Sequence, residues 1–567
     1  MPVFVQKELT AKRAEGQFNT FRSSPQQNLS GAGDTIVSRR RKIGIMFRKK
    51  EEKERAHYGP YLVFVCMFAA LGSVSFGYSA AVIGTTLGQP SFISYMGLDT
   101  APNAASLIGA MNGLFFAGGV FGSALHGWLS HRYGRKMSIA VGCILIIVSG
   151  ACLTGAVNIS MFIAFRFFNG LGAFQLLAGV PLYIAEIVSP KHRGVLSDIH
   201  AVGLNVGYAG SGYIGLGFFF TDFAQAWRPP MGIQMAPPLI LVLGLYWIPE
   251  SPRWLLAQGR AEEAWAIVAR LHRSRSDTTT EFAEREFYQM KVQIDFESRM
   301  DTSYTEIFRR PSFRKRAIMT IFLTFVVTSS GVLVINNYGA LLYSSLGYDA
   351  RDTLLLQTGW TATALVFNAV AMLFVDRVRR NWLISIGFFM LMCVQICNTA
   401  LQKHFLGSTN KGGLGAAAAM LYLYIIFFSL FLDGPLYFYV AEIWPTHLRA
   451  KGYALGMGAL SLANMIWLLA APTAFVTIGW TFYIFFICFS ALGCIVSLTW
   501  FPNTLHKPLE EIATLFGDHD LVKVYQEQIA AEQLGPHGHT ENSLKEKSQT
   551  DEEEHIEAVK AETARVS

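Results

Sequence analysis

The sequence has little charge and no early apolar stretch. Of its 567 residues, 15% are Asp, Glu, Lys or Arg, whereas an average soluble protein has about 25%. The first 60 residues are polar and lack the apolar core of a signal peptide, so we expect no cleavable leader. The shortage of charge excludes an ordinary soluble domain and favours a chain that lies in lipid.

Patterns that carry chemistry are also scarce. The seven cysteines all fall within apolar stretches, which is typical of small core residues and not of disulfides or zinc ligands. The sequence has no Walker motif, no metal-ligand cluster and no nucleophile constellation. We therefore expect no enzyme activity, no cofactor, no metal and no pumping driven by ATP. Basic residues lie beside the apolar stretches, so we expect no nucleic-acid partner.

Long apolar runs are what the sequence has in abundance. A helix needs about 20 apolar residues to cross a bilayer. Runs of that size form two sets of six, and this predicts an all-α membrane protein with twelve transmembrane helices. The runs lie near 61–83, 105–129, 137–156, 161–185, 197–220, 229–248, 317–346, 354–374, 382–402, 416–441, 453–475 and 478–501.

Lys and Arg residues predict the orientation and the domains. They concentrate on one side of the spans, with nine of them in 39–55, so we expect both termini to be cytoplasmic. The amphipathic spacing of 254–272 predicts short helices in the polar linker. The predicted parts are a cytoplasmic N-terminal tail (1–60), a six-helix bundle (61–248), a cytoplasmic linker (249–315), a second six-helix bundle (316–501) and a cytoplasmic C-terminal tail (502–567).

The two halves contain a repeated motif. The fourth span ends in 181-PLYIAEIVSPKHRG-194 and the tenth in 435-PLYFYVAEIWPTHLRAKG-452. Both contain Tyr-x-Ala-Glu-Ile, then Pro, then Arg seven residues after the Glu. Repeated membrane halves are typical of transporters in which two bundles move around a site between them.

Charges at the cytoplasmic helix ends are candidates for a gate. Opposite charges on neighbouring helix ends can form ion pairs across the two bundles in one conformation and separate in the other. The alternative is that these residues only fix the topology, but that does not explain the glutamates. The candidate gating residues are Arg132, Arg135, Glu186, Arg193, Asp376, Arg377, Arg380, Glu442 and Arg449.

Several longer motifs resemble a known family. They are 166-RFFNGLGAF-174, 249-PESPRWLL-256, 331-GVLVINNYGALLYSSLG-347, 442-EIWPTHLRAKG-452 and 502-PNTLHKPLEEIATLFG-517. With them the chain resembles the sugar porter family of the major facilitator superfamily, in its fungal type, over about residues 60–517. The resemblance implies the major facilitator fold, a multi-pass protein of the plasma membrane, and transport of a sugar, polyol or sugar-like solute.

The coupling residues depart from the family pattern. Proton-coupled members of the family carry Asp where this chain has Ser79, and that Asp pairs with the arginine that is Arg166 here. Both positions lie about 27 to 30 Å along their helices from the same membrane face, and we expect Arg166 to bond Ser79 or Tyr78, or to reach water. Transport can therefore be facilitative or coupled to protons, and the coupling candidates are Ser79, Arg166 and Asp433.

The sugar-binding set is also altered. Amide positions of the family are occupied by Ala201, Val327, Thr328, Leu333 and Leu468. A sugar hydroxyl both donates and accepts hydrogen bonds, so the loss of amides weakens the expectation of simple hexose transport. An exporter of a specialised metabolite is the alternative, and a non-transporting nutrient sensor is a further one.

Asp433 is the most informative polar residue in a predicted span. It lies nine residues before Glu442, about 13 Å from the cytoplasmic face, where an ionisable group is by default functional. Gly434 and Pro435 follow it and predict a broken helix. Asp433 can bind solute, carry a coupling proton, or cap that break. The candidate solute-binding residues are His200, Asn205, Asn336, Asn337, Tyr338, Asp433, Tyr437 and Asn464.

Overall fold

Every secondary-structure element in the described part of the chain is helical. The computed structural model describes residues 59–527, apart from 189–192, 222, 274–280, 299, 301–302, 372, 374–376, 409, 506, 508, 519, 521 and 524–525. The predicted N-terminal tail therefore lies outside the described residues up to Tyr58, as does the C-terminal tail beyond Glu527.

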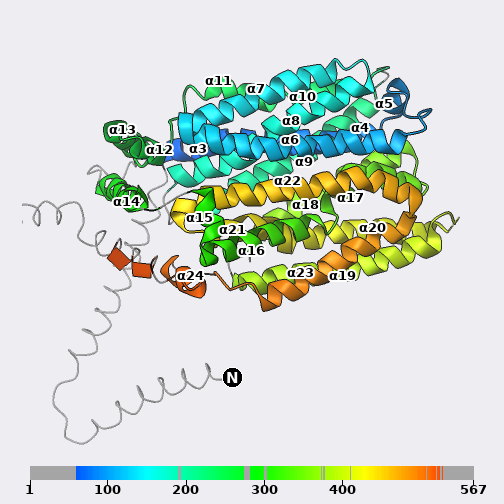
Figure 1. Cartoon of the computed structure of the whole chain (residues 1–567). Helices are drawn as coiled ribbons and strands as arrows, with labels where there is room; N and C mark the ends of the chain where they lie inside the picture. The colour runs from blue at the N-terminus through cyan, green and yellow to red at the C-terminus, as the bar shows by residue number, and fades with distance from the viewer. Residues whose placement is uncertain are drawn as a thin grey trace, which may run out of the picture. The chain divides into compact units, whose positions relative to one another are not determined.

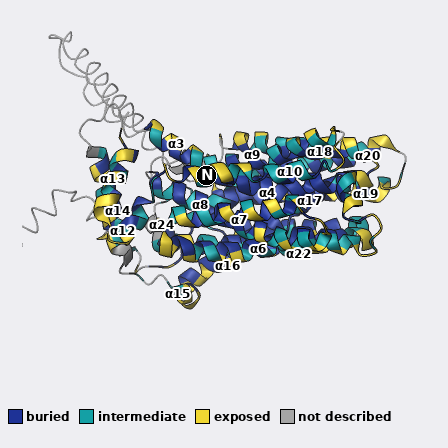
Figure 2. Ribbon diagram, turned by 90° about the horizontal axis from the view of Figure 1, so that it is seen from above, coloured by how far each residue is buried: buried dark blue, intermediate teal, exposed yellow. Residues whose placement is uncertain are grey.

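Ten helical segments of the described residues are long and apolar enough to cross a membrane. Large apolar side chains such as Phe121 and Val476 are exposed, as contact with lipid requires. Figure 2 shows exposed positions distributed along these helices. The ten are α3–α4 (Pro60–Ala69 and Leu71–Leu87), α6 (Ala104–Tyr133), α7 (Arg135–Thr154), α8 (Ile159–Ile187), α16–α17 (Pro311–Thr328 and Val332–Ser345), α18 (Ala350–Ala371), α19 (Arg380–Phe405), α20 to α21 (Lys411–Phe428 and Gly434–Glu442), α22 (Thr446–Thr477) and α23 (Tyr483–Thr499) with the short η3 (Gly479–Phe482) before it.

Two further stretches fall where the fifth and sixth spans are predicted. One is the helix α9 (Arg193–Phe219), and the other consists of α10 (Arg228–Ile233) and α11 (Ala236–Gly244). The glycines of α9 let it approach α4 closely. A Cβ on Gly77 would collide with the carbonyl of Leu204, and one on Gly207 with the carbonyl of Val74. Small residues here therefore serve backbone contact between helices.

Short helices lie at both ends of the long ones. At one end are α12 (Pro252–Ala257), α13 (Ala261–Leu271), α14 (Glu281–Ser298), α15 (Tyr304–Arg309) and α24 (Leu509–Leu515), and at the other is α5 (Pro90–Tyr95) (Figure 1). The predicted amphipathic stretch 254–272 is divided between α12 and α13, and α13 buries Ala264, Val268 and Leu271. The linker thus forms helices of its own beside the helix ends.

Helices from the two halves of the sequence pack against each other in three main pairs. These are α6 with α22, α9 with α18, and α4 with α17. Near α5, glycines allow close contact between the halves: a Cβ on Gly84 would come within 3.0 Å of the carbonyl oxygen of Asn336, and one on Gly109 within 2.7 Å of that of Leu469. The two halves are therefore closed against each other at the end that carries α5.

Candidate solute-binding site

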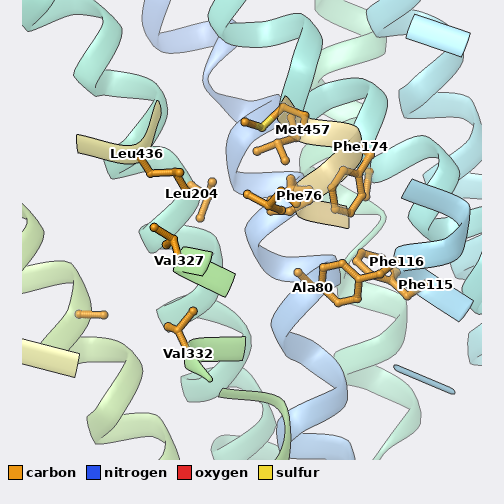
Figure 3. Close-up of a cluster of buried hydrophobic side chains, with 14 of the residues drawn as sticks. Phe76, Ala80, Phe115, Phe116, Phe174, Leu204, Val327, Val332, Leu436 and Met457 are labelled. Carbon is orange, nitrogen blue, oxygen red and sulfur yellow. The ribbon is translucent and has the colours of Figure 1, made fainter. Parts of the chain in front are cut away.

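A pocket lies between the two halves of the sequence. Its volume is about 720 Å³ with the open mouth included, and its lining comes from α4, α6, α8 and α9 on one side and from α16, α17, α18, α20, α21, α22 and Asp433 on the other. Figure 3 shows Phe76, Leu204, Val327 and Leu436 gathered in this region. The apolar lining consists of Phe76, Phe116, Leu177, Leu204, Val327, Val332, Leu333, Ala364, Ile425, Phe428, Leu436 and Leu460.

Five of the predicted binding residues meet in this pocket, namely Asn205, Asn336, Asp433, Tyr437 and Asn464. They come from α9, α17, the turn before α21, α21 itself and α22. Two of them offer free hydrogen-bonding atoms. Asn336 Oδ1 and Asn464 Nδ2 are buried and have no protein partner among the described residues. One acceptor and one donor therefore remain for a solute.

Asp433 lies at the end of a widened helical turn. The chain does not break before Gly434 as predicted, because residues Ser429–Asp433 form a π-helical turn, η2, that joins α20 to α21. Asp433 keeps helical dihedrals and its side chain caps no backbone N–H, so the capping role is not the one seen. Its Oδ2 instead accepts a hydrogen bond from Asn368 Nδ2 at 2.7 Å. Such turns are frequent at functional sites because they redirect side chains.

Three other predicted binding residues lie outside the pocket lining. His200 hydrogen-bonds Ser73 through Nδ1 (2.6 Å), and its ring meets that of Tyr437 edge-on. The hydroxyl of Tyr338 donates to the carbonyl of Leu468 at 2.7 Å. Asn337 is buried where α17 approaches Gly84. His200 and Tyr338 thus join neighbouring helices, whereas the buried amide of Asn337 has no hydrogen-bond partner among the described residues.

Arg166 and Ser79 form a separate buried site. Arg166 is fully buried and does not reach water. Its Nη1 donates to the backbone carbonyl of Ser79 (2.9 Å), its Nε donates to that of Met111 (3.2 Å), and its guanidinium lies 4.3 Å from the ring centre of Phe115. The Ser79 hydroxyl has no partner among the described residues. Carbonyl dipoles and an aromatic face therefore surround the arginine.

Four of the predicted gating residues form two ion pairs, and neither of these pairs joins the two bundles in this conformation. Arg135 of α7 binds Glu186 of α8 through two hydrogen bonds of 2.6 and 2.8 Å. Arg380 of α19 binds Glu442 of α21 at 3.1 and 3.4 Å. Each pair joins helices of one half of the sequence, because the partner helix ends are neighbours within that half.

The remaining gating candidates are exposed, are partly buried or lie outside the described residues. Arg132 and Arg377 are exposed, and Arg449 is partly buried. Asp376 is not among the described residues, and the side chain of Arg193 is not described either.

Sequence reasoning missed the residues that complete these pairs. Ser251 donates its hydroxyl to Glu186, and Thr504 donates to Glu442 at 2.5 Å. Glu250 accepts hydrogen bonds from the backbone N–H groups of Arg135 and Lys136. Burial raises the pKa of Glu250, although those N–H bonds oppose the change. The signal was available in the sequence, since PES (249–251) and PNT (502–504) follow the last span of each half.

The resemblance of this chain to known proteins extends beyond these motifs. The family model described as Sugar (and other) transporter matches residues 65–516. The chain belongs to this family. As a member it is a membrane transporter and not an enzyme.

Several curated proteins resemble this Sugar (and other) transporter family member over most of their length. The MFS-type transporter criB of Aspergillus cristatus is 29% identical over 472 residues, covering 82% of this chain and 95% of that protein. A high-affinity glucose transporter of Kluyveromyces lactis is 28% identical, with coverage of 81% and 86%. A quinate permease of Neurospora africana is 26% identical, with coverage of 87% and 95%.

Solved structures of the proton:xylose symporter XylE support the major facilitator fold. The complex with 6-bromo-6-deoxy-D-glucose has a TM-score of 0.68 at 22% identity, covering 81% of this chain and all of that one. A partially occluded inward open conformation of XylE from E. coli has a TM-score of 0.66 at 20% identity, with coverage of 79% and 100%.

Helix α18 carries pocket residues that were not predicted from the sequence. Trp360, Thr361 and Ala364 line the pocket, and Asn368 binds Asp433. Positions 360, 361, 364 and 368 recur at helical spacing, so they share one face of α18. That spacing was the available signal, but a face with two apolar members does not stand out in an apolar span.

Proposed function

We propose that the chain carries a sugar or sugar-like polar solute across a membrane by alternating access. The observation that carries the proposal is the pocket between the two sequence halves, which has unpartnered Asn336 and Asn464 atoms in its wall. In alternating access the site lies between two bundles that move around it. Relatives named as glucose transporters, quinate permeases and a polyol transporter of Arabidopsis thaliana favour a polyhydroxylated solute.

In this proposal α9 is the fifth crossing and α10–α11 the sixth, giving twelve in two bundles (61–248 and 316–501). Both termini, the linker helices and α24 are then cytoplasmic, as the basic residues beside the spans favour. With that orientation the end closed by Gly84 and Gly109 faces outward. The pocket accordingly belongs to an inward-facing conformation, and the plasma membrane is the proposed location.

We assign solute binding to Asn205, Asn336, Asp433, Tyr437 and Asn464. Transport is facilitative or proton-coupled, and the placement of charges favours Asp433 over the outer site for any proton. Ser79 supplies no carboxylate to Arg166, whereas Asp433 faces the pocket. An intramembrane carboxylate beside a solute is a common proton carrier.

Export of a specialised metabolite is the second candidate. The observation that favours it is the lining itself, in which twelve apolar residues outnumber the amides. A bulkier and less polar solute than a hexose would fill such a pocket.

Uptake and efflux of a radiolabelled solute panel test the proposal. Cells that lack their own transporters would express the full chain, with and without a protonophore. We expect saturable movement of at least one polyhydroxylated solute. Normal surface expression with no movement of any solute in either direction would contradict transport, and loss of movement with the protonophore would establish proton coupling.

A further inference from the structure

The charge inside the pocket is one-sided. Of the lining residues, Asp433 alone carries a full charge, and no Lys, Arg or His lies among them. The amide of Asn368 donates to its Oδ2 at 2.7 Å, and the amide of Asn205 lies beside it. An ionised carboxylate that is withdrawn from water is costly, so it either takes up a proton or is accompanied by a cation. Within the described lining, the protein supplies hydrogen bonds to this carboxylate but no countercharge.

The surroundings of Asp433 are suited to a cation. Tyr208 of α9 and Tyr437 of α21 line the pocket together with Asp433. Trp360 lines the same pocket. Aromatic faces attract cations, and their attraction grows when water is excluded. A carboxylate flanked by tyrosines is therefore a chemical match for an ammonium group, and apolar side chains beyond it match an uncharged body.

We propose that the solute selected by this pocket carries a protonated amine, which binds Asp433, on a body held by the apolar lining and by Asn336 and Asn464. This inference rests on the proposed transport function and refines its substrate class from a neutral sugar to an amine-bearing solute. Asn368 acts as a positioning residue, since it fixes one oxygen of the carboxylate without lining the pocket.

The test compares molecules that differ only in an amine and a hydroxyl group. The pairs are phenethylamine with 2-phenylethanol, and glucosamine with glucose, at a mildly acidic pH where the amines are protonated. Binding to the purified full chain is measured by ligand-induced thermal stabilisation, and movement by uptake into proteoliposomes. We expect at least one amine to bind about tenfold more tightly than its alcohol, which is about 1.4 kcal/mol.

Variants assign the preference to one carboxylate. Asp433→Asn is nearly isosteric and should abolish the preference, Asp433→Glu should retain part of it, and Asp352→Asn should leave it unchanged. Asp352 is a matched control because it lies exposed at the start of α18, outside the pocket lining.

Equal binding of both members of each pair by the native chain, or no binding of either, would overturn the inference. So would a preference that persists in Asp433→Asn. Uptake of glucose without any amine preference would overturn the inference and leave the transport proposal standing. An amine preference in binding with no movement of any solute would leave the inference standing and overturn the transport proposal.

Discussion

The two halves of the molecule contain the same polar cluster built with different chemistry. In the first half, Arg135 binds Glu186, and Ser251 donates to the same carboxylate. In the second half, Arg380 binds Glu442, and Thr504 donates to it. The hydroxyl residue in each cluster belongs to the segment that follows the last span of its half.

Further details of the clusters correspond. The hydroxyl of Tyr183 donates to the carbonyl of Pro249, and that of Tyr439 donates to the carbonyl of Pro502. The backbone N–H of Arg135 donates to Glu250, and that of Arg380 donates to Asn503. The repeated PLY and Ala-Glu-Ile motifs therefore correspond to a repeated three-dimensional arrangement.

The difference between the clusters lies in burial and charge. Both partners of the first pair are largely buried, with 15% and 10% of their side chains exposed, whereas Glu442 is 29% exposed. The first cluster has the carboxylates of Glu186 and Glu250, and the second has Glu442 with the neutral Asn503. One repeated motif thus supports a shorter pair with a largely buried glutamate in one half, and a longer pair with a more exposed glutamate in the other.

Removal of the arginine from the tighter pair should have the largest effect. Arg135→Met leaves Glu186 buried with a hydroxyl partner and no countercharge, and we expect the free energy of unfolding to fall by about 3 kcal/mol. Equilibrium unfolding in mixed detergent micelles measures this. Arg132→Met is the matched control, since Arg132 is exposed and should change the value by less than about 0.5 kcal/mol. Equal losses in the two variants would show that the pair is not the stabilising feature.

The corresponding change in the second half should cost less. In Arg380→Met, water can solvate the partly exposed Glu442, and Met retains apolar contact with the ring of Phe438, which lies 4.3 Å from the guanidinium. We expect a loss of about 1 to 2 kcal/mol in the same assay. The exposed Arg377→Met serves as control. A loss as large as that of Arg135→Met would remove the distinction between the clusters.

These clusters also show what the sequence reveals and what it does not. The repeated Glu and Arg positions, the long apolar runs and Asp433 could be predicted, because each depends on residue type and spacing along the chain. The pairing of Arg135 with Glu186 could not, because it depends on which helix ends become neighbours in space.

Helix rotation sets a similar limit at the pocket. Asn336 lines it while the adjacent Asn337 and Tyr338 do not, since successive residues on a helix are turned by about 100°. Sequence spacing fixes these relative angles but not which angle faces the pocket. The π-helical turn at Asp433 was also beyond prediction, because Gly and Pro normally indicate an interruption.

The hydroxyl donors offer a smaller test of the same comparison. Ser251 both donates to Glu186 and accepts from the N–H of Trp254 at the start of α12, whereas the side chain of Thr504 has the carboxylate bond alone among the described residues. We expect Ser251→Ala to cost about 2 kcal/mol and Thr504→Val about 1 kcal/mol in unfolding free energy. The reverse order would mean that the second cluster depends more on its hydroxyl than on its ion pair.

Replacing Glu250 with an amide, which the other half has in Asn503, should have the smallest effect on stability. The direction in which this effect changes with pH distinguishes burial from charge attraction as its cause. Because burial raises the pKa of Glu250 in the folded chain, folding favours the protonated carboxyl. The stability that this proton contributes is complete below the unfolded pKa of about 4.3 and is lost as pH rises through the folded pKa. Glu250→Gln cannot titrate, and its amide oxygen can still accept the N–H bonds of residues 135 and 136.

We therefore expect Glu250→Gln to match the native chain at acidic pH and to become relatively more stable as pH rises to neutral, measured by thermal unfolding across that range. Asn503→Asp should add a titrating carboxyl at the corresponding place and give a difference of the opposite sign. If Glu250→Gln instead becomes relatively less stable towards neutral pH, then the attraction of Arg135 and the backbone N–H bonds outweigh burial. The ionised carboxylate would in that case be the form that the first cluster requires.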